Sequence, residues 1–192
     1  MLINLHPETN IAPATGKVLI SEPFLGDPYF KRTIVLLCEY SKEGAFGFVL
    51  NKYVNLDITE LLEGFPSIKS RIGIGGPVQN TNLYYLHTRG DIIPNAIPVS
   101  EYLFMGGDFE RMQELVREKT ILPSEIRFFI GYAGWDAGQL DEELEQKSWF
   151  VGDISSQQIM NTSQNDLWEK VLKDMGGDYE LLTQFPEDPS LN

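Results

Sequence analysis

The sequence contains a single cysteine, Cys38, and only two histidines, His6 and His87, which lie far apart in the chain. One thiol cannot form a disulfide within the chain, and these residues are too few and too scattered to build a zinc site. We therefore predict no metal centre. The lone thiol also agrees with a reducing compartment, so we expect the protein to be cytoplasmic.

Long apolar runs are also missing. No stretch approaches the roughly 20 apolar residues that a membrane-spanning helix needs. The start of the chain, residues 1–7, has no basic segment, and its apolar stretch is too short for a signal peptide. The sequence therefore predicts no contact with a membrane.

Basic side chains are scarce in the last third of the chain. Residues 134–192 carry 3 basic and 13 acidic side chains, which is −10 of the total net charge of −13. The segment most similar to a helix-turn-helix, 166–185, has Asp178 and Glu180 in its second element and no Lys or Arg there. A recognition helix would bring those carboxylates against phosphates. We predict no direct binding of nucleic acid.

The length and the apolar content predict one folded domain. A chain of 192 residues with 42% apolar residues is long enough to bury a core and too apolar to be disordered. We expect a loosely held arm over 1–15, a single domain over 16–184 and a flexible tail over 185–192. Alternation and β-branched runs predict strands at 17–20, 33–38, 43–50, before 73–77, and at 82–87, 102–105, 127–132 and 148–151. The second and third strands are expected to form an antiparallel hairpin, and 82–87 to pair with the strand before 73–77. The pattern is a mixed α+β fold.

Capping residues and apolar periodicity predict four helices. Asp57 begins a short helix that runs through Phe65, with Glu60 in a capping box. Asp108 begins a second helix, and residues 166–175 form a third. Between them, Asp141, Glu142, Glu143 and Glu145 are expected to form the solvated first face of another helix, where the helix dipole favours carboxylates.

The glycines of Gly73-Ile-Gly-Gly-Pro77 suggest a phosphate-binding loop. A P-loop needs Lys followed by Ser or Thr after the glycines, and a dinucleotide site needs a helix to begin there. Residues 77–80, Pro-Val-Gln-Asn, provide neither. A tight turn or a close backbone approach is the alternative that glycine serves equally well. We predict no nucleotide cofactor.

Nucleophilic catalysis is poorly supported by the sequence. There is no G-x-S-x-G motif, and Cys38 ends an apolar strand beside Glu39, a setting that raises the pKa of a thiol. We predict that Cys38 is buried and structural. His87 ends a strand beside Thr88 and Arg89, where a surface or capping role is more common than that of a base. No residue is assigned a catalytic role.

The stretch Gly131-Tyr-Ala-Gly-Trp135 follows an apolar run and precedes an acidic segment. We expect it to be a loop after a strand, where open α/β sheets bind ligands, with Trp135 and Gln139 presented to the ligand. Asp136, Asp141 and Glu142 would repel phosphate, so a neutral or cationic ligand, or the backbone of a partner, fits better. The hypothesis is one cleft formed by Asn51, Gly75, Gly76, Pro77, Gly131, Gly134, Trp135 and Gln139. The alternative is that Trp135 only packs as a lid on the core.

Several of these motifs together resemble the AlgH/YqgE family. They are Gly16-Lys-Val-Leu-Ile20, Asp27-Pro-Tyr-Phe-Lys-Arg-Thr33, Gly44-Ala-Phe-Gly-Phe-Val-Leu-Asn51, Gly75-Gly-Pro-Val78 and Gly131-Tyr-Ala-Gly-Trp135 with Gly138-Gln-Leu140, in the order of the family and over about 13–177. The resemblance implies a compact bacterial domain whose branched sheet curls into a small barrel flanked by helices. The family commonly has Cys-Glu-His where this chain has Cys38-Glu39-Tyr40, so a mechanism that uses that histidine as a base does not carry over.

Two alternative functions are therefore expected. In the first, the cleft binds a small molecule in a protein that is not DNA-binding by itself. In the second, the protein has no chemistry of its own and acts in regulation through protein partners, in line with the transcriptional-regulator label that family members often carry. For its own assembly we expect a monomer or a weak homo-oligomer.

Overall fold

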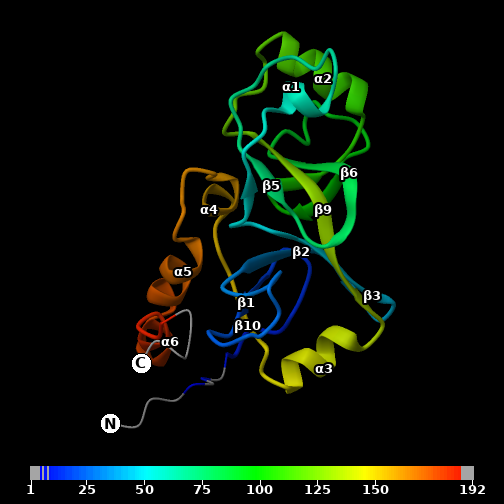
Figure 1. The fold of residues 1–192 in the computed structure, drawn as a ribbon. Helices are drawn as coiled ribbons and strands as arrows, with labels where there is room; N and C mark the ends of the chain where they lie inside the picture. The colour runs from blue at the N-terminus through cyan, green and yellow to red at the C-terminus, as the bar shows by residue number, and fades with distance from the viewer. Residues whose placement is uncertain (1–4, 6, 8, 187–192) are drawn as a thin grey trace.

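The computed structural model describes residues 5, 7 and 9–186, and within them one branched β-sheet with helices around it (Figure 1). The strands are β1 (Val18–Ser21), β2 (Ile34–Ser41), β3 (Gly44–Val49), β4 (Tyr53–Val54), β5 (Ile72–Ile74), β6 (Val78–His87), β7 (Ile97–Ser100), β8 (Leu103–Met105), β9 (Ile126–Asp136) and β10 (Trp149–Gly152). Their order is β10-β1-β2-β3-β9-β6-β8-β7, with β5 pairing to both β4 and β9. The predicted α+β class is confirmed.

The branch lies in β9, which pairs with three strands. Residues 126–132 pair with β6, residues 129 and 130 also pair with β5 in parallel, and residues 133–136 pair with β3. Gly131 lies at this change of partner with φ +67°, a conformation that favours glycine. A Cβ at this position would lie 2.6 Å from the carbonyl oxygen of Gly76. A single kinked strand therefore holds the two halves of the sheet together.

The expected barrel is not closed. The strand order is an open path that ends at β10 and β7, and no ladder joins these two strands in the described part of the chain. β7 comes close to the segment before β1 instead, where a Cβ on Gly16 would lie 2.8 Å from the carbonyl oxygen of Val99. The branched sheet that the resemblance implied is present, but it curls without closing.

The Gly131–Trp135 motif lies inside a strand and not in a loop after one. We expected the strand to end at Tyr132, but β9 continues to Asp136 because β3 provides a ladder for it, with Gly44 opposite Asp136 and Gly47 opposite Ala133. A Cβ on Gly44 would lie 2.4 Å from the carbonyl oxygen of Trp135, so the glycine allows the two strands to approach. The length of β9 is therefore set by its pairing with β3, which lies about 90 residues earlier in the chain.

Other strand pairings were partly predicted. β2 and β3 form the expected antiparallel hairpin. The expected pairing of 82–87 with the strand before 73–77 is wrong, because β5 pairs with β4 and β9 whereas β6 pairs with β8 and β9. The short strands β4 and β7 were not predicted. β4 has only two residues, too few to alternate, and β7 is interrupted by Pro98, a residue that argues against a strand.

In the described residues, six helices lie around the sheet: α1 (Ile58–Leu61), α2 (Phe109–Arg117), α3 (Gln139–Glu145), α4 (Ser156–Met160), α5 (Leu167–Met175) and α6 (Gly177–Leu182). In Figure 1, α1 and α2 cover one end of the molecule, α3 lies beside β3 at the other, and α4, α5 and α6 line one side. The capping box of Asp57 and Glu60 is confirmed, although α1 ends at Leu61 and not at Phe65. α4 and α6 were not among the four predicted helices. No helix of the described residues is both long enough and apolar enough to span a bilayer.

Three apolar clusters form the core. One lies under α5 and α6, a second under α1 and α2, and a third joins β1, β2 and β10 to α3. In the predicted arm, the hydroxyl of Thr9 donates to the carbonyl of Val151 at 2.9 Å, and the carbonyl of Pro7 accepts from Tyr179 at 3.2 Å. Residues 1–4, 6, 8 and 187–192 of the predicted arm and tail lie outside the described residues.

Candidate functional site

Asn51 lies at the end of β3, where its side chain is bound to the backbone of a neighbouring segment. Its Oδ1 accepts from the N–H of Ile34 at 3.0 Å, and its Nδ2 donates to the carbonyl of Arg32 at 2.8 Å. Both ends of the amide are therefore engaged in holding the start of β2. Asn51 does not line the groove described below.

Gly75 and Gly76 meet the branch of β9. A Cβ on Gly75 would lie 2.3 Å from the carbonyl oxygen of Gly131, and a Cβ on Gly76 would lie 2.2 Å from the backbone of Tyr132. The glycine segments thus converge as predicted in the hypothesis of one cleft, but they pack on each other. The close backbone approach that we gave as the alternative to a phosphate loop is confirmed. Gly75, Gly76, Pro77 and Gly131 are not among the residues that line the groove.

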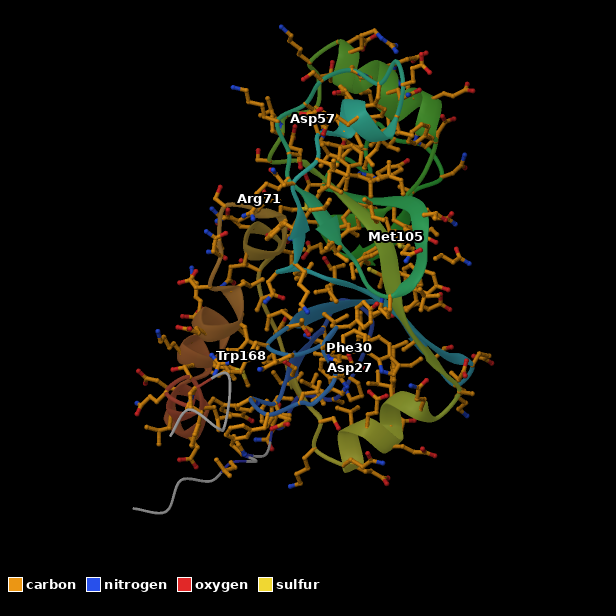
Figure 2. All side chains as sticks on the ribbon, in the orientation of Figure 1. Asp27, Phe30, Asp57, Arg71, Met105 and Trp168 are labelled. Atoms are coloured by element: carbon orange, nitrogen blue, oxygen red, sulfur yellow. The ribbon has the colours of Figure 1, made fainter. Side chains whose placement is uncertain are left out.

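Trp135 is buried, with 6% of its surface exposed, and its indole N–H donates to Oε2 of Glu143 at 2.9 Å. The same oxygen accepts from the indole N–H of Trp149 at 2.7 Å, and Oε1 of Glu143 accepts from Nε2 of Gln139 at 3.0 Å. The expectation that Glu143 belongs to a solvated helix face is therefore wrong. Its carboxylate accepts from both indoles, so it fixes α3 to the sheet. Phe30, which is labelled in Figure 2, completes this cluster, because its ring stacks on that of Trp135.

A groove runs along the open end of the β3–β9 ribbon. Its volume is about 510 Å³, and its lining residues are Glu39, Ser41, Glu43, Gly44, Ala45, Phe46, Val78, Tyr132, Gly134, Trp135, Asp136 and Gln139. We call it the acidic groove because its three ionisable carboxylates, Glu39, Glu43 and Asp136, are all exposed. The structure brings Gly134, Trp135 and Gln139 of the predicted cleft together here.

An apolar pocket adjoins the acidic groove. Its volume is about 340 Å³, and it is lined by Glu39, Phe46, Leu83, Tyr84, Tyr85, Ile97, Met105 and Gly106. Glu39 and Phe46 line both depressions, so the two adjoin at these side chains. The pocket lies where the sheet curls without closing, between β2 on one side and β7 and β8 on the other.

Three aromatic rings pack together at the boundary between the acidic groove and the apolar pocket. The ring of Phe46 lies 4.6 Å from that of Tyr132 and 6.0 Å from that of Tyr84, and these two tyrosines are 5.7 Å apart. Aromatic contacts of this kind add to the stability that burial alone gives. The three rings therefore support one another where the groove and the pocket adjoin.

Cys38 and His87 are both buried. Cys38 is 3% exposed, which confirms the predicted burial, and burial raises the pKa of its thiol well above the usual range. His87 is 0% exposed, so the expected surface position is wrong. Its Nδ1 accepts from the N–H of Arg89 at 3.1 Å, which leaves Nε2 as the donor to the carbonyl of Gly106 at 2.9 Å. Burial lowers the pKa of His87, so the ring is a neutral structural group.

Arg127 is a buried cation that the sequence analysis treated only as the first residue of a strand. It is 0% exposed, and its guanidinium donates to the carbonyls of Leu50 and Ile159 and to the hydroxyl of Tyr53. Burial lowers its pKa to about 10. An arginine at the start of an otherwise apolar strand was the only signal for this arrangement, and charged residues at strand ends are usually exposed.

Comparison with known sequences shows which proteins this chain is similar to. The sequence profile described as AlgH-like matches residues 18–180. A protein of Chlorobaculum parvum, named as a UPF0301 protein, is 44% identical over 92% of this chain and 95% of its own length. A UPF0301 protein of Cytophaga hutchinsonii is 44% identical over 92% of this chain and 98% of its own length.

Two solved structures have a similar fold. The AlgH protein from Pseudomonas aeruginosa, solved in solution, superposes with a TM-score of 0.72 at 26% identity and covers 93% of this chain and 98% of its own. A crystal structure of a Corynebacterium diphtheriae protein superposes with a TM-score of 0.78 at 24% identity and covers 92% of this chain and 95% of its own. The latter likeness concerns the fold alone.

Proposed function

This chain belongs to the AlgH-like family, and we propose that it acts as a binding protein whose acidic groove and apolar pocket receive one segment of a partner protein. The segment would be extended and would carry basic side chains beside an apolar one. The observation that supports this proposal best is that the groove and the pocket lie side by side and share Glu39 and Phe46 as lining residues. One ligand can therefore contact both surfaces.

The charge of the groove favours a cationic ligand. Glu39, Glu43 and Asp136 form no ion pair with any Lys or Arg in the part of the chain that the structure describes. Carboxylates of one sign in a groove attract an oppositely charged ligand and repel phosphate. A basic peptide fits this surface, and a nucleotide does not.

The apolar pocket favours a protein segment over a small molecule. Ile97 lines the pocket while 53% of its surface remains exposed, so the mouth of the pocket is itself apolar. An apolar side chain of a peptide would cover Ile97 and Met105, and its backbone would continue into the groove. This combines the two functions expected from the sequence, since the ligand of the cleft is then the regulatory partner. The single buried thiol, Cys38, supports a cytoplasmic setting for this interaction.

The proposal can be tested with a short amidated peptide that alternates lysine or arginine with leucine. Binding is followed by amide chemical shifts in two-dimensional NMR spectra of the isotope-labelled full chain. We expect saturable shifts at Phe46, Tyr132, Gly134 and Met105. A triple variant, Glu39→Gln with Glu43→Gln and Asp136→Asn, should weaken binding roughly tenfold, at less than about 1 kcal/mol for each exposed charge.

A matched control has the same change in net charge away from the groove, namely Glu63→Gln with Glu110→Gln and Glu180→Gln. These residues are exposed and line neither depression. If the control weakens binding as much as the groove variant, the interaction is general attraction to an acidic protein. If an acidic or uncharged peptide binds equally well, or only a small aliphatic molecule shifts the pocket amides, the proposed partner is wrong.

A further inference from the structure

Three cations on the other side of the molecule have no carboxylate partner. Arg127 is buried, whereas Lys69 and Arg71 are exposed, and none of the three forms an ion pair within the described residues. Figure 2 places Arg71 beside α4, across the view from Met105 of the apolar pocket. An uncompensated positive cluster is unexpected in a chain of net charge −13.

Tyr53 joins two of these cations. The guanidinium of Arg71 lies 3.7 Å from the centre of the Tyr53 ring, and that of Arg127 lies 5.6 Å from it. Arg71 also donates to the carbonyl of Thr162 at 3.1 Å and to Oδ1 of Asn165 at 2.9 Å, which fixes the turn after α4. Both arginines are therefore held in place by neutral groups, and their charge remains uncompensated. Burial strengthens the field of Arg127, because little water screens it.

Two cavities meet at Lys69, and the larger of them also reaches Arg71. One of about 360 Å³ is lined by Lys69, Ser124, Gln157, Asn161, Thr162 and Ser163 together with two apolar residues, and none of its lining residues is acidic. The other, of about 720 Å³, extends toward α1 and includes Arg71 and Ser70. Lys69, Thr162 and Ser163 line both. The hydroxyl of Ser70 is buried and has no hydrogen-bond partner in the described structure.

The acidic residues of the larger cavity are engaged elsewhere. Asp57 accepts from the backbone N–H of Thr59 at 2.9 Å, and Glu60 accepts from the N–H of Asp57 at 2.7 Å, in the capping box of α1. An anion would therefore lie at the other end, against Lys69 and the turn after α4. A lysine ammonium with nearby hydroxyl and amide groups is a common way to hold a phosphate group.

We propose that the junction of these cavities, at Lys69, Thr162 and Ser163, is a binding site for the phosphate group of a small molecule. The ligand would balance the charge of Lys69 and Arg71, and its polar remainder would contact the amides of Gln157 and Asn161 in the smaller cavity. This site is separate from the acidic groove and does not depend on the function proposed for it.

The test is an NMR titration of the full chain with glycerol 3-phosphate, inorganic phosphate and glycerol, at constant ionic strength set with chloride. We expect both phosphates to give saturable shifts of the amides of Lys69, Ser70, Thr162 and Ser163, and glycerol to give none. Lys69→Gln should weaken phosphate binding at least about fivefold, whereas Lys69→Arg should keep most of it, because the point charge is what the site requires. Lys42→Gln, which removes an exposed charge from a distant hairpin, should leave binding unchanged.

Three results would overturn the site. Shifts that rise linearly without saturation would mean that phosphate only screens the surface. An equal loss in Lys69→Gln and Lys42→Gln would mean that attraction is not local. Shifts of the same amides by glycerol alone would mean that the cavity recognises hydroxyl groups and not charge. The amide spectrum of each variant, recorded without ligand, shows whether its fold is intact.

Discussion

The indole of Trp149 donates a 2.7 Å hydrogen bond to the carboxylate of Glu143, on a helix that otherwise presents its acidic residues to water. Trp135 donates to the same oxygen from β9, which is separated from β10 by three strands in the sheet. One carboxylate thus connects β9, β10 and α3. The acidic groove is next to this connection, since Trp135 and Gln139 line it.

Replacing Glu143 with Ala should lower the free energy of unfolding by about 2–3 kcal/mol, because two partly buried indole donors lose a charged acceptor. Urea unfolding followed by tryptophan fluorescence measures the change. The matched control is Glu142→Ala on the exposed side of α3, which should change stability by less than about 0.5 kcal/mol. Equal effects for the two variants would mean that the bonds to Glu143 contribute nothing.

Gly75→Ala should destabilise the protein by about 2–3 kcal/mol, because the added methyl group would meet the carbonyl oxygen of Gly131, an atom that cannot move without shifting β9. Gly26→Ala is the control, since nothing lies within 4 Å of a Cβ at that position. Thermal unfolding of both variants makes the comparison. A neutral Gly75→Ala would show that the branch of the sheet tolerates expansion.

His87 should make stability fall as the pH drops below about 6.5, the usual pKa of histidine in an unfolded chain. Burial lowers the pKa of His87 in the fold, so in this range the unfolded chain takes up a proton that the folded protein does not. The loss is at most about 1.4 kcal/mol per pH unit from this one group, and it ends below the folded pKa.

Urea unfolding of the protein and of His87→Gln between about pH 5.5 and pH 7.5 isolates this contribution, because most carboxylates remain ionised there. The variant should show a flatter dependence on pH, whatever its absolute stability. The same slope in both proteins would assign the effect to other groups.

Cys38 should react slowly with a thiol reagent in the native protein, because it is buried and its pKa is raised. Reaction should become fast in denaturant. Cys38→Ser should cost about 1–3 kcal/mol, since a hydroxyl would be buried there without a strong partner, and Cys38→Ala serves as the comparison without a polar group. Native labelling at the rate of free cysteine would contradict the structural role.

The purified protein should not bind duplex DNA in a sequence-dependent manner. Residues 134–192 carry a net charge of −10, and α6, the second helix of the helix-turn-helix lookalike, contains Asp178 and Glu180 and no basic residue. Fluorescence anisotropy with a library of labelled duplexes at physiological salt measures this directly. Nanomolar binding to one sequence over others would show that the prediction is wrong.

Local patterns predicted the elements whose signals lie close together in the sequence. The capping box of α1, the β2–β3 hairpin and the buried face of α5 depend on residues close together in the sequence, and these were correct. The length of β9 depends on pairing with β3, and the partners of β5 and β6 depend on β9. A propensity scale contains no information about such distant partners, so these were missed.

The candidate site was predicted only in part for a similar reason. Gly134, Trp135 and Gln139 line the acidic groove, but Glu39 and Phe46, which connect it to the apolar pocket, were not singled out. Asn51 and Gly75 share the glycine-and-amide chemistry of binding loops, yet they are bound within the fold. Residue type alone does not show whether a group is free to bind a ligand or already contacts other parts of the fold.

The dependence of both halves of the sheet on β9 has a consequence for synthesis on the ribosome. β3, β5 and β6 are made well before residues 126–136, and their ladders to β9 span long stretches of chain. Pairings of this kind form slowly, because a large loop must close, at a cost in chain entropy, before the stabilising contacts can form. β1 is separated from its partner β10 by a still longer stretch of chain. The nascent chain therefore exposes unpaired strand edges until most of it has emerged, and this is the period in which chaperones and aggregation compete for it.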